Sequence, residues 1–218
     1  MRYRLYRGHK YVSYALSELE RAISKTNFAS NEAVKKIKTQ LEPTIEMIKF
    51  HAMYEDKTIH ELLRKKSSDI HLAIESDHKH HDAIFQELSD ILDQIVQSEN
   101  PEEKIDLGYE FYLKYRLFVG ENLIHLHKEE TIIMKELQRL YPNDEDLKVD
   151  YDTYNKMTTD QMIHMMEVLF PHMDINDHYV YLKDIKTSQP EKFLLVWPAT
   201  ENIFSTEHRI ALAEMLSL

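Results

Sequence analysis

Apolar residues recur at alternating steps of three and four along most of this 218-residue chain, and this spacing constrains the fold more than any other feature. Such steps place the apolar residues on one face of an α-helix. The pattern predicts four long helices separated by linkers near residues 26–31, 65–68, 97–102 and 141–146. Pro43 lies inside the second helical segment, where it either kinks the helix or begins a fresh one. Four long helices with short connections favour an antiparallel four-helix bundle.

The predicted fold class is therefore all-α, with two parts. The bundle is predicted to cover residues 1–142, and residues 143–218 are predicted to form a C-terminal helical extension packed on it. A helix break is expected at Phe170–Pro171. Shorter helices are expected near residues 177–188, 190–203 and 205–218.

Composition excludes several classes of protein. The chain has no cysteine, which removes disulfide scaffolds, thiolate zinc sites, cysteine-ligated iron–sulfur clusters and cysteine nucleophiles. Only 3 glycines disfavour Gly-rich nucleotide loops, and a formal charge of −11 argues against binding to nucleic acid. No signal peptide and no run of apolar residues long enough to span a membrane is recognised, so a cytoplasmic protein without a membrane partner is expected.

The chain has 13 histidines, an unusual number, and potential metal ligands interrupt all four apolar stripes. His51 and Glu55 are four residues apart, and so are His125 and Glu129, so each pair leaves one helix face one turn apart. Burial of imidazoles and carboxylates without partners is unfavourable, whereas a shared buried ion compensates all of them. The candidate metal ligands are His9, His51, Glu55, His78, His81, His125 and Glu129.

Seven nitrogen and oxygen donors are too many for one tetrahedral zinc ion and suit two metal ions a few ångströms apart. Imidazole and carboxylate without thiolate suit iron, and also manganese or zinc. The donor set alone leaves the identity of the metal open.

Short motifs on the four predicted helices match one known family when they are taken together and in order. They are Arg7-Gly8-His9-Lys10, His51-x-x-x-Glu55-Asp56, Asp77-His78 and His125-Leu126-x-x-Glu129-Glu130. Over roughly residues 5–140 the chain resembles the hemerythrin-like family, which carries the HHE cation-binding domain. The resemblance implies two iron ions in an oxo- and carboxylate-bridged centre, with this ligand set: His51 and His125 terminal, Glu55 and Glu129 bridging, His9 and His78 completing the two irons.

Two differences from the animal oxygen carriers bear on function. Those carriers space two third-helix histidines four apart, whereas His78 and His81 are three apart, so His81 is either a ligand or a donor that orients one. The carriers also use an aspartate five residues beyond the last-helix histidine, whereas here Glu129 lies four beyond His125. Binding of O2, NO or peroxide for sensing, storage or detoxification is therefore expected rather than simple transport, with a homodimer as the candidate assembly.

Residues around the predicted centre carry further expectations. The second stripe is expected to continue from Glu55 to Thr58 and Leu62, and the fourth to end on Ile132. An apolar wall is expected from Ile48, Leu88, Phe118 and Ile132. Candidates for hydrogen bonds to a bound ligand are Tyr115 and Asn122, and candidates for orienting the imidazoles are Tyr54, Asp77 and Asp82. The histidines interpreted as ordinary structural residues are His60, His71, His80, His127, His164, His172, His178 and His208.

Two alternatives stay open. An HD-type metal-dependent phosphohydrolase would use His81-Asp82 with His51 thirty residues upstream, but this leaves Glu55 and His125 unexplained. A helical regulatory protein or an iron-centre repair protein would use the same donors as a sensor. Whether the chain is an enzyme is not decided by these residues.

Overall fold

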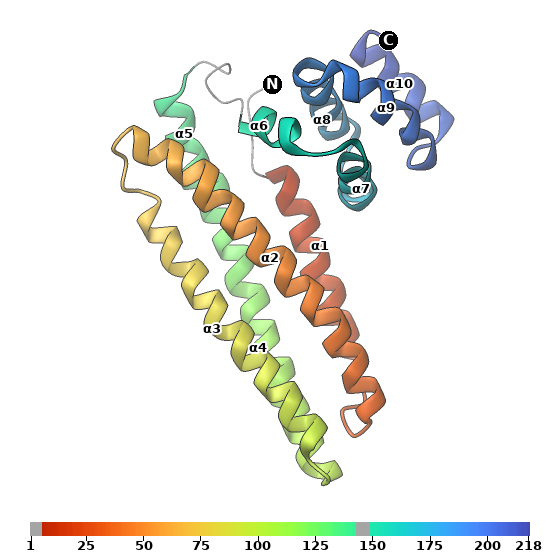
Figure 1. The fold of residues 1–218 in the computed structure, drawn as a ribbon. Coiled ribbons are helices and arrows are strands. Elements are labelled where there is room, and N and C mark those ends of the chain that lie inside the picture. Colours follow the sequence, from red (N-terminus) through yellow and green to blue (C-terminus); the bar gives the residue numbers. More distant parts are fainter. Residues whose placement is uncertain (1–5, 143–148) are drawn as a thin grey trace. The chain divides into compact units, whose positions relative to one another are not determined.

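The computed structural model describes residues 6–142 and 149–218, and this part of the chain is helical without any strand (Figure 1). It divides into two compact units. Residues 12–140 form the long-helix unit, and residues 1–11 group with residues 141–218 in the C-terminal unit. The predicted linker at 141–146 lies mostly outside the described residues. The packing of residues 143–218 on the preceding helices stays a prediction.

The long-helix unit is built from consecutive helices that share one core. In chain order these are α1 (Tyr6–Ile23, of which Val12 onward belongs here), α2 (Asn31–Lys65), α3 (Leu72–Gln97), α4 (Pro101–Lys128), the π-helix η1 (Glu129–Ile133) and α5 (Met134–Leu140). Helix α3 packs against both α2 and α4, and α5 contacts α2. The core cluster draws on every long helix, with Leu16 from α1, Leu41 from α2, Leu88 from α3 and Phe111 from α4.

Local sequence explains where these helices begin. Ser30 caps α2, its side chain accepting a hydrogen bond from the Ala33 backbone N–H at 3.3 Å. Asn100 caps α4 in the same way, accepting from the Glu102 N–H at 3.0 Å, and Pro101 occupies the first helical turn. Pro43 lies within α2, which continues unbroken from Asn31 to Lys65. The alternative prediction, that a new helix begins at this proline, is therefore wrong.

The buried stripe of α2 departs from the predicted one after Glu55. The structure buries Ile59, His60 and Leu63, whereas Thr58 and Leu62 are only half-buried. Two successive steps of four, rather than a three and a four, carry the stripe from Glu55 to Leu63. The change of register turns His60 into the protein.

A second change of register follows α4. Residues Glu129–Ile133 form a π-helix, whose wider turn holds an extra residue. As a result Ile133 is fully buried, while Ile132 is 45% exposed. The prediction that Ile132 joins the apolar wall is therefore wrong; the other predicted wall residues, Ile48, Leu88 and Phe118, are buried as expected.

Glycine is required at one position of α4 and not at another. A Cβ on Gly108 would lie against Cγ of Phe28 and 2.5 Å from its Cβ, because the loop before α2 crosses α4 there. A Cβ on Gly120 would meet no atom within 4 Å among the described residues.

The C-terminal unit consists of short helices around its own apolar core. They are α6 (Val149–Lys156), α7 (Thr159–Leu169), the 3-10 turn η3 (Phe170–His172), α8 (Ile175–Ser188), α9 (Pro190–Ala199), the 3-10 turn η4 (Thr200–Asn202) and α10 (Thr206–Leu216). Met162, Met166 and Phe170 are buried in this core. The predicted break at Phe170–Pro171 is confirmed, because the chain leaves α7 there through η3.

The first turns of α1 belong to this unit through a buried carboxylate. Asp177 of α8 is fully buried and accepts a hydrogen bond from the Tyr6 hydroxyl at 2.8 Å. Arg7 Nε lies 3.2 Å from the same carboxylate oxygen, and Lys10 Nζ lies 2.5 Å from the other. Lys10 also contacts Asp174, the residue that caps α8.

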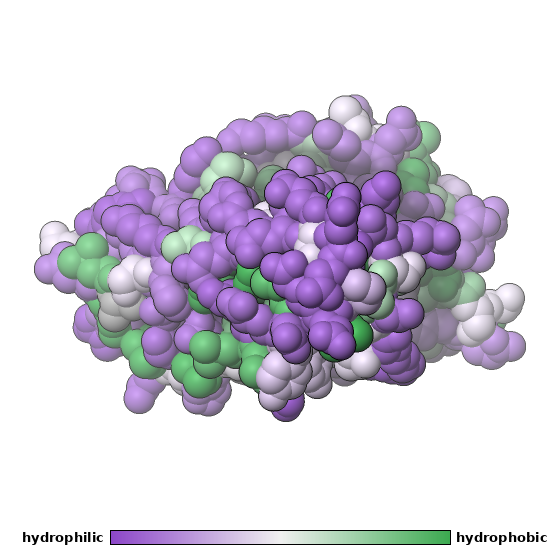
Figure 2. Space-filling model, turned by 90° about the horizontal axis from the view of Figure 1, so that it is seen from below, coloured by the Kyte–Doolittle hydropathy of each residue, from purple (hydrophilic) through white to green (hydrophobic). Residues whose placement is uncertain are grey.

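Apolar side chains remain at the surface in places. Tyr109, Leu113, Leu117 and Ile124 follow one stripe of α4 and are all exposed. Figure 2 shows one face of the molecule, on which hydrophobic residues form small groups among hydrophilic ones. None of the helices in the described ranges has the length and apolarity needed to cross a membrane. The homodimer stays a prediction.

Candidate metal centre

Four of the predicted ligands converge inside the long-helix unit. Glu55 comes from α2, His78 from α3, His125 from the end of α4, and Glu129 from the first position of η1. Their ligand atoms all lie within 4.8 Å of one another, and all four residues are buried. Buried carboxylate and imidazole donors in this arrangement can hold a metal ion.

The two imidazoles face each other. His78 Nε2 lies 3.0 Å from His125 Nε2, and each ring is held from behind by a carboxylate. His78 Nδ1 lies 3.2 Å from Asp56 Oδ1, and His125 Nδ1 lies 3.3 Å from Asp77 Oδ2. A carboxylate accepts a hydrogen bond from Nδ1–H, and in the neutral ring this leaves the lone pair on Nε2, pointing inward. Two inward lone pairs at this distance repel, so that either a proton on one Nε2 atom or a metal cation has to lie beside them.

The two buried glutamates add negative charge at the same place. His125 Nε2 lies 3.2 Å from Glu129 Oε1, and His78 Nε2 lies 3.9 Å from Oε2 of Glu55. Burial raises the pKa of Glu55 well above its usual range, and the neighbouring Glu129 charge raises it further. Burial also opposes ionisation of Glu129, but the hydrogen bond from His125 outweighs it and lowers the pKa of Glu129 to about 2. A carboxylate pair held this closely needs a proton or a cation between its members.

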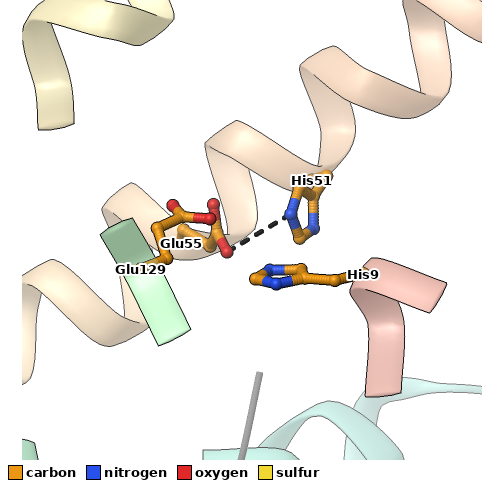
Figure 3. Close-up of side chains that lie close together, drawn as sticks. All are labelled: His9, His51, Glu55 and Glu129. Atoms are coloured by element: carbon orange, nitrogen blue, oxygen red, sulfur yellow. Dashed lines mark ion pairs between the residues drawn. The ribbon is translucent and has the colours of Figure 1, made fainter. Parts of the chain in front are cut away.

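His51 extends the group along α2. Its Nε2 atom lies 3.3 Å from Glu55 Oε1, and Figure 3 shows this imidazole facing the Glu55 carboxylate, with Glu129 beside it. His9, which Figure 3 also draws, lies on the face of α1 that carries Val12 and Leu16. Residues 1–11 group with the C-terminal unit, so a role for His9 in this centre stays a prediction.

His81 lies beside the group rather than within it. Its ring is buried at 5.4 Å from the His125 ring and 5.5 Å from the Phe118 ring, measured between centroids. Among the described residues it joins none of the groups whose ligand atoms lie within 4.8 Å. Burial lowers the pKa of His81 to about 4, so the ring is neutral at pH 7. Coordination by His81 stays a prediction.

The residues predicted to orient the imidazoles or to bind a ligand lie in different environments. Asp77 contacts His125, as predicted, and also accepts from Lys128 at 2.9 Å. Asp82 is instead 62% exposed and 3.9 Å from Lys49, and so does not face an imidazole. Two side chains predicted to bind a ligand are instead hydrogen-bonded to the main chain. The Tyr115 hydroxyl donates to the Leu16 carbonyl, and the Asn122 amide donates to the Phe118 carbonyl.

Sequence reasoning missed Asp56 and His60. Asp56 holds His78 by its Nδ1, and His60 is 99% buried, with 1% of its surface exposed. The sequence does contain a signal for this pair, because Asp56 and His60 have the same one-turn spacing as His51 and Glu55. The assumed register of α2 placed His60 off the buried stripe.

Comparison with known proteins returned no match to a family model, to a curated protein or to a solved structure. The resemblance to the hemerythrin-like family therefore depends on the motifs of this chain alone.

Proposed function

We propose that this chain is a hemerythrin-like protein that holds two iron ions and binds O2 or a related small ligand, NO or peroxide. The proposal includes an antiparallel four-helix bundle over residues 1–142, with His9 from its first helix as a ligand. Sensing, storage and detoxification of the small ligand are the functions that such a centre serves.

The observation that carries the proposal is the pair of Nε2 atoms, from His78 and His125, that face each other at 3.0 Å beside two buried carboxylates. Carboxylates behind both rings favour the tautomers whose Nε2 lone pairs face inward, where a metal ion can bind both. A pair of divalent cations accounts for the lone pairs and for the carboxylate charge together.

Each residue has a separate task in this proposal. His51 and His125 would be end ligands, Glu55 and Glu129 would be shared by the two irons, and His9 and His78 would complete the ligand set. Asp77 and Asp56 fix the rings of His125 and His78. The buried side chains of Ile48 and Phe118 exclude water from the side of the core. Two bound iron ions would supply a redox-active metal with an open position for a small ligand.

The phosphohydrolase alternative gains no support from the geometry. It needs His81 and Asp82 on one ion, but Asp82 points to the surface.

The test is iron binding by matched variants. The metal-stripped chain is loaded with Fe²⁺ without oxygen, desalted and analysed for iron. We expect two irons per chain in the wild type, and a loss of at least one in His125→Ala and in Glu129→Gln. His127→Ala removes an exposed histidine from the same helix and should keep both irons.

Ligand binding is tested on the same samples. Addition of O2, NO or peroxide to the loaded wild type should produce a new absorption band in the near ultraviolet, and each ligand is a separate arm. A wild type that retains no iron, or a His125→Ala variant that retains two, contradicts the proposal.

A further inference from the structure

A second group of ligand-type side chains, from α2 and α3, lies next to the candidate centre, because its Asp56 also contacts His78. Asp56, His60 and Glu75 place their ligand atoms within 4.8 Å of one another. His60 is buried, whereas the Asp56 and Glu75 side chains are 41% and 27% exposed, so the group is accessible from solvent. We refer to these three residues as the second donor group.

His60 is the unusual member. Its Nδ1 atom lies 2.8 Å from Asp56 Oδ1 and 3.6 Å from Glu75 Oε1. In the part of the chain that the structure describes, this buried nitrogen nevertheless makes no hydrogen bond. A nitrogen that faces two carboxylates without donating to either has the placement of a metal ligand. Donor atoms that share one tetrahedral zinc ion lie about 3.3 Å apart.

His71 approaches the same carboxylate from the other side. Its Nδ1 donates to the Ser68 carbonyl at 2.9 Å, which leaves the lone pair of the neutral ring on Nε2. That Nε2 lies 3.7 Å from Glu75 Oε1, and the ring centroids of His71 and His60 are 5.6 Å apart. A lone pair and a carboxylate oxygen at this distance favour a cation near both.

One cation already contacts the group. Arg64 donates to Glu75 Oε1 at 2.9 Å and to the Asp56 backbone carbonyl at 2.7 Å, and its side chain is 40% exposed. An exposed guanidinium–carboxylate pair stabilises a protein only weakly, so a divalent ion can displace it.

We propose that Asp56, His60 and Glu75, with His71 as a fourth donor, bind one divalent transition-metal ion of the Zn²⁺ or Fe²⁺ class. This site is separate from the candidate centre but touches it, because Asp56 Oδ1 lies 3.2 Å from His78 Nδ1. It is more exposed and has fewer buried charges than the centre, and therefore binds more weakly. The proposal goes beyond the proposed function and does not depend on it.

Zinc titration of the metal-stripped chain by calorimetry tests this site. We expect the wild type to bind three Zn²⁺ ions, the third more weakly than the first two. His60→Ala and Glu75→Gln should each weaken the third ion by at least about tenfold and leave the first two. His80→Ala, which removes an exposed histidine of α3, should retain all three.

A variant with higher affinity for zinc distinguishes a metal site from a merely structural contact. Arg64→Gln removes the competing cation and should tighten the third ion by about threefold. If the wild type binds no zinc, or if His60→Ala and Glu75→Gln weaken none of the zinc ions that it binds, the second site is refuted.

Different results would contradict the proposed iron centre and the proposed second metal site. In His125→Ala the candidate centre is damaged, yet the zinc that depends on His60 should remain. If the centre binds no metal at all, that zinc is still expected as a single ion per chain. A His60-dependent ion that disappears in His125→Ala contradicts the separate site.

Discussion

Substitution of the buried carboxylate in the C-terminal unit by its neutral isostere, Asp177→Asn, should destabilise that unit strongly. Asp177 is fully buried and contacts the Tyr6 hydroxyl, Arg7 and Lys10. The Arg7 side chain is only 5% exposed, so the substitution removes a negative charge next to a buried guanidinium. Removal of one partner from a buried ion pair costs about 3–5 kcal/mol.

Two features reduce the expected cost. Asparagine keeps one acceptor oxygen for the Tyr6 hydroxyl, and the Lys10 side chain is 32% exposed, so solvent screens its share. We expect a loss of about 3 kcal/mol in the free energy of unfolding of this unit. With a urea dependence of about 1.5 kcal/mol per molar, the unfolding midpoint should fall by about 2 M.

The chain provides a selective probe for this measurement. Trp197 is the single tryptophan and lies in α9, packed on Phe193, so its fluorescence reports the C-terminal unit. Glu167→Gln is the matched control, because that glutamate is 54% exposed and 3.8 Å from His164. The control should change stability by less than about 0.5 kcal/mol. A midpoint for Asp177→Asn that is equal to that of the control would refute the reasoning.

Three further predictions test the described structure. Gly108→Ala should destabilise by about 1–3 kcal/mol because its new methyl group meets the ring and Cβ of the neighbouring phenylalanine, whereas Gly120→Ala should stabilise by about 0.5–1 kcal/mol; thermal unfolding followed by circular dichroism compares them, and equal signs would contradict the packing. In the π-helix, Ile133→Ala should cost about 2–5 kcal/mol and Ile132→Ala less than about 0.5 kcal/mol; the reverse order in urea unfolding would show that the π-turn is absent. The hydrogen bond from its lysine partner lowers the pKa of Asp174 to about 2 from 3.8, so its carboxylate stabilises the C-terminal unit above about pH 4 and less as the pH falls to 2. The stability difference between wild type and Asp174→Asn should shrink over that interval in Trp fluorescence titrations, and a constant difference would contradict the ion pair.

In the candidate site, the sequence could predict contacts between residues that lie one turn apart on the same helix. His51 with Glu55, and His125 with Glu129, each occupy one face of a helix regardless of its neighbours, and the structure places both pairs in contact. His78 joins them because α3 packs between α2 and α4. All-helical structure followed from the same periodicity.

The part that could not be predicted depends on register. A pattern of threes and fours fixes a helix face only to within about one residue, and two local shifts exceeded that tolerance. The π-helix buries Ile133 where the pattern predicted Ile132. After Glu55 the buried residues of α2 follow steps of four, which buries His60. The role of Asp56 depends on which neighbouring helix it faces, which a single helix does not specify.

The most direct test of the account is X-ray diffraction from crystals of the iron-loaded chain, recorded on both sides of the iron absorption edge. The account predicts two iron peaks in the anomalous difference map, each about 2 Å from carboxylate oxygens of Glu55 and Glu129 and from one or more imidazole nitrogens. A map without iron at these carboxylates, or with one tetrahedral zinc ion in their place, would contradict it.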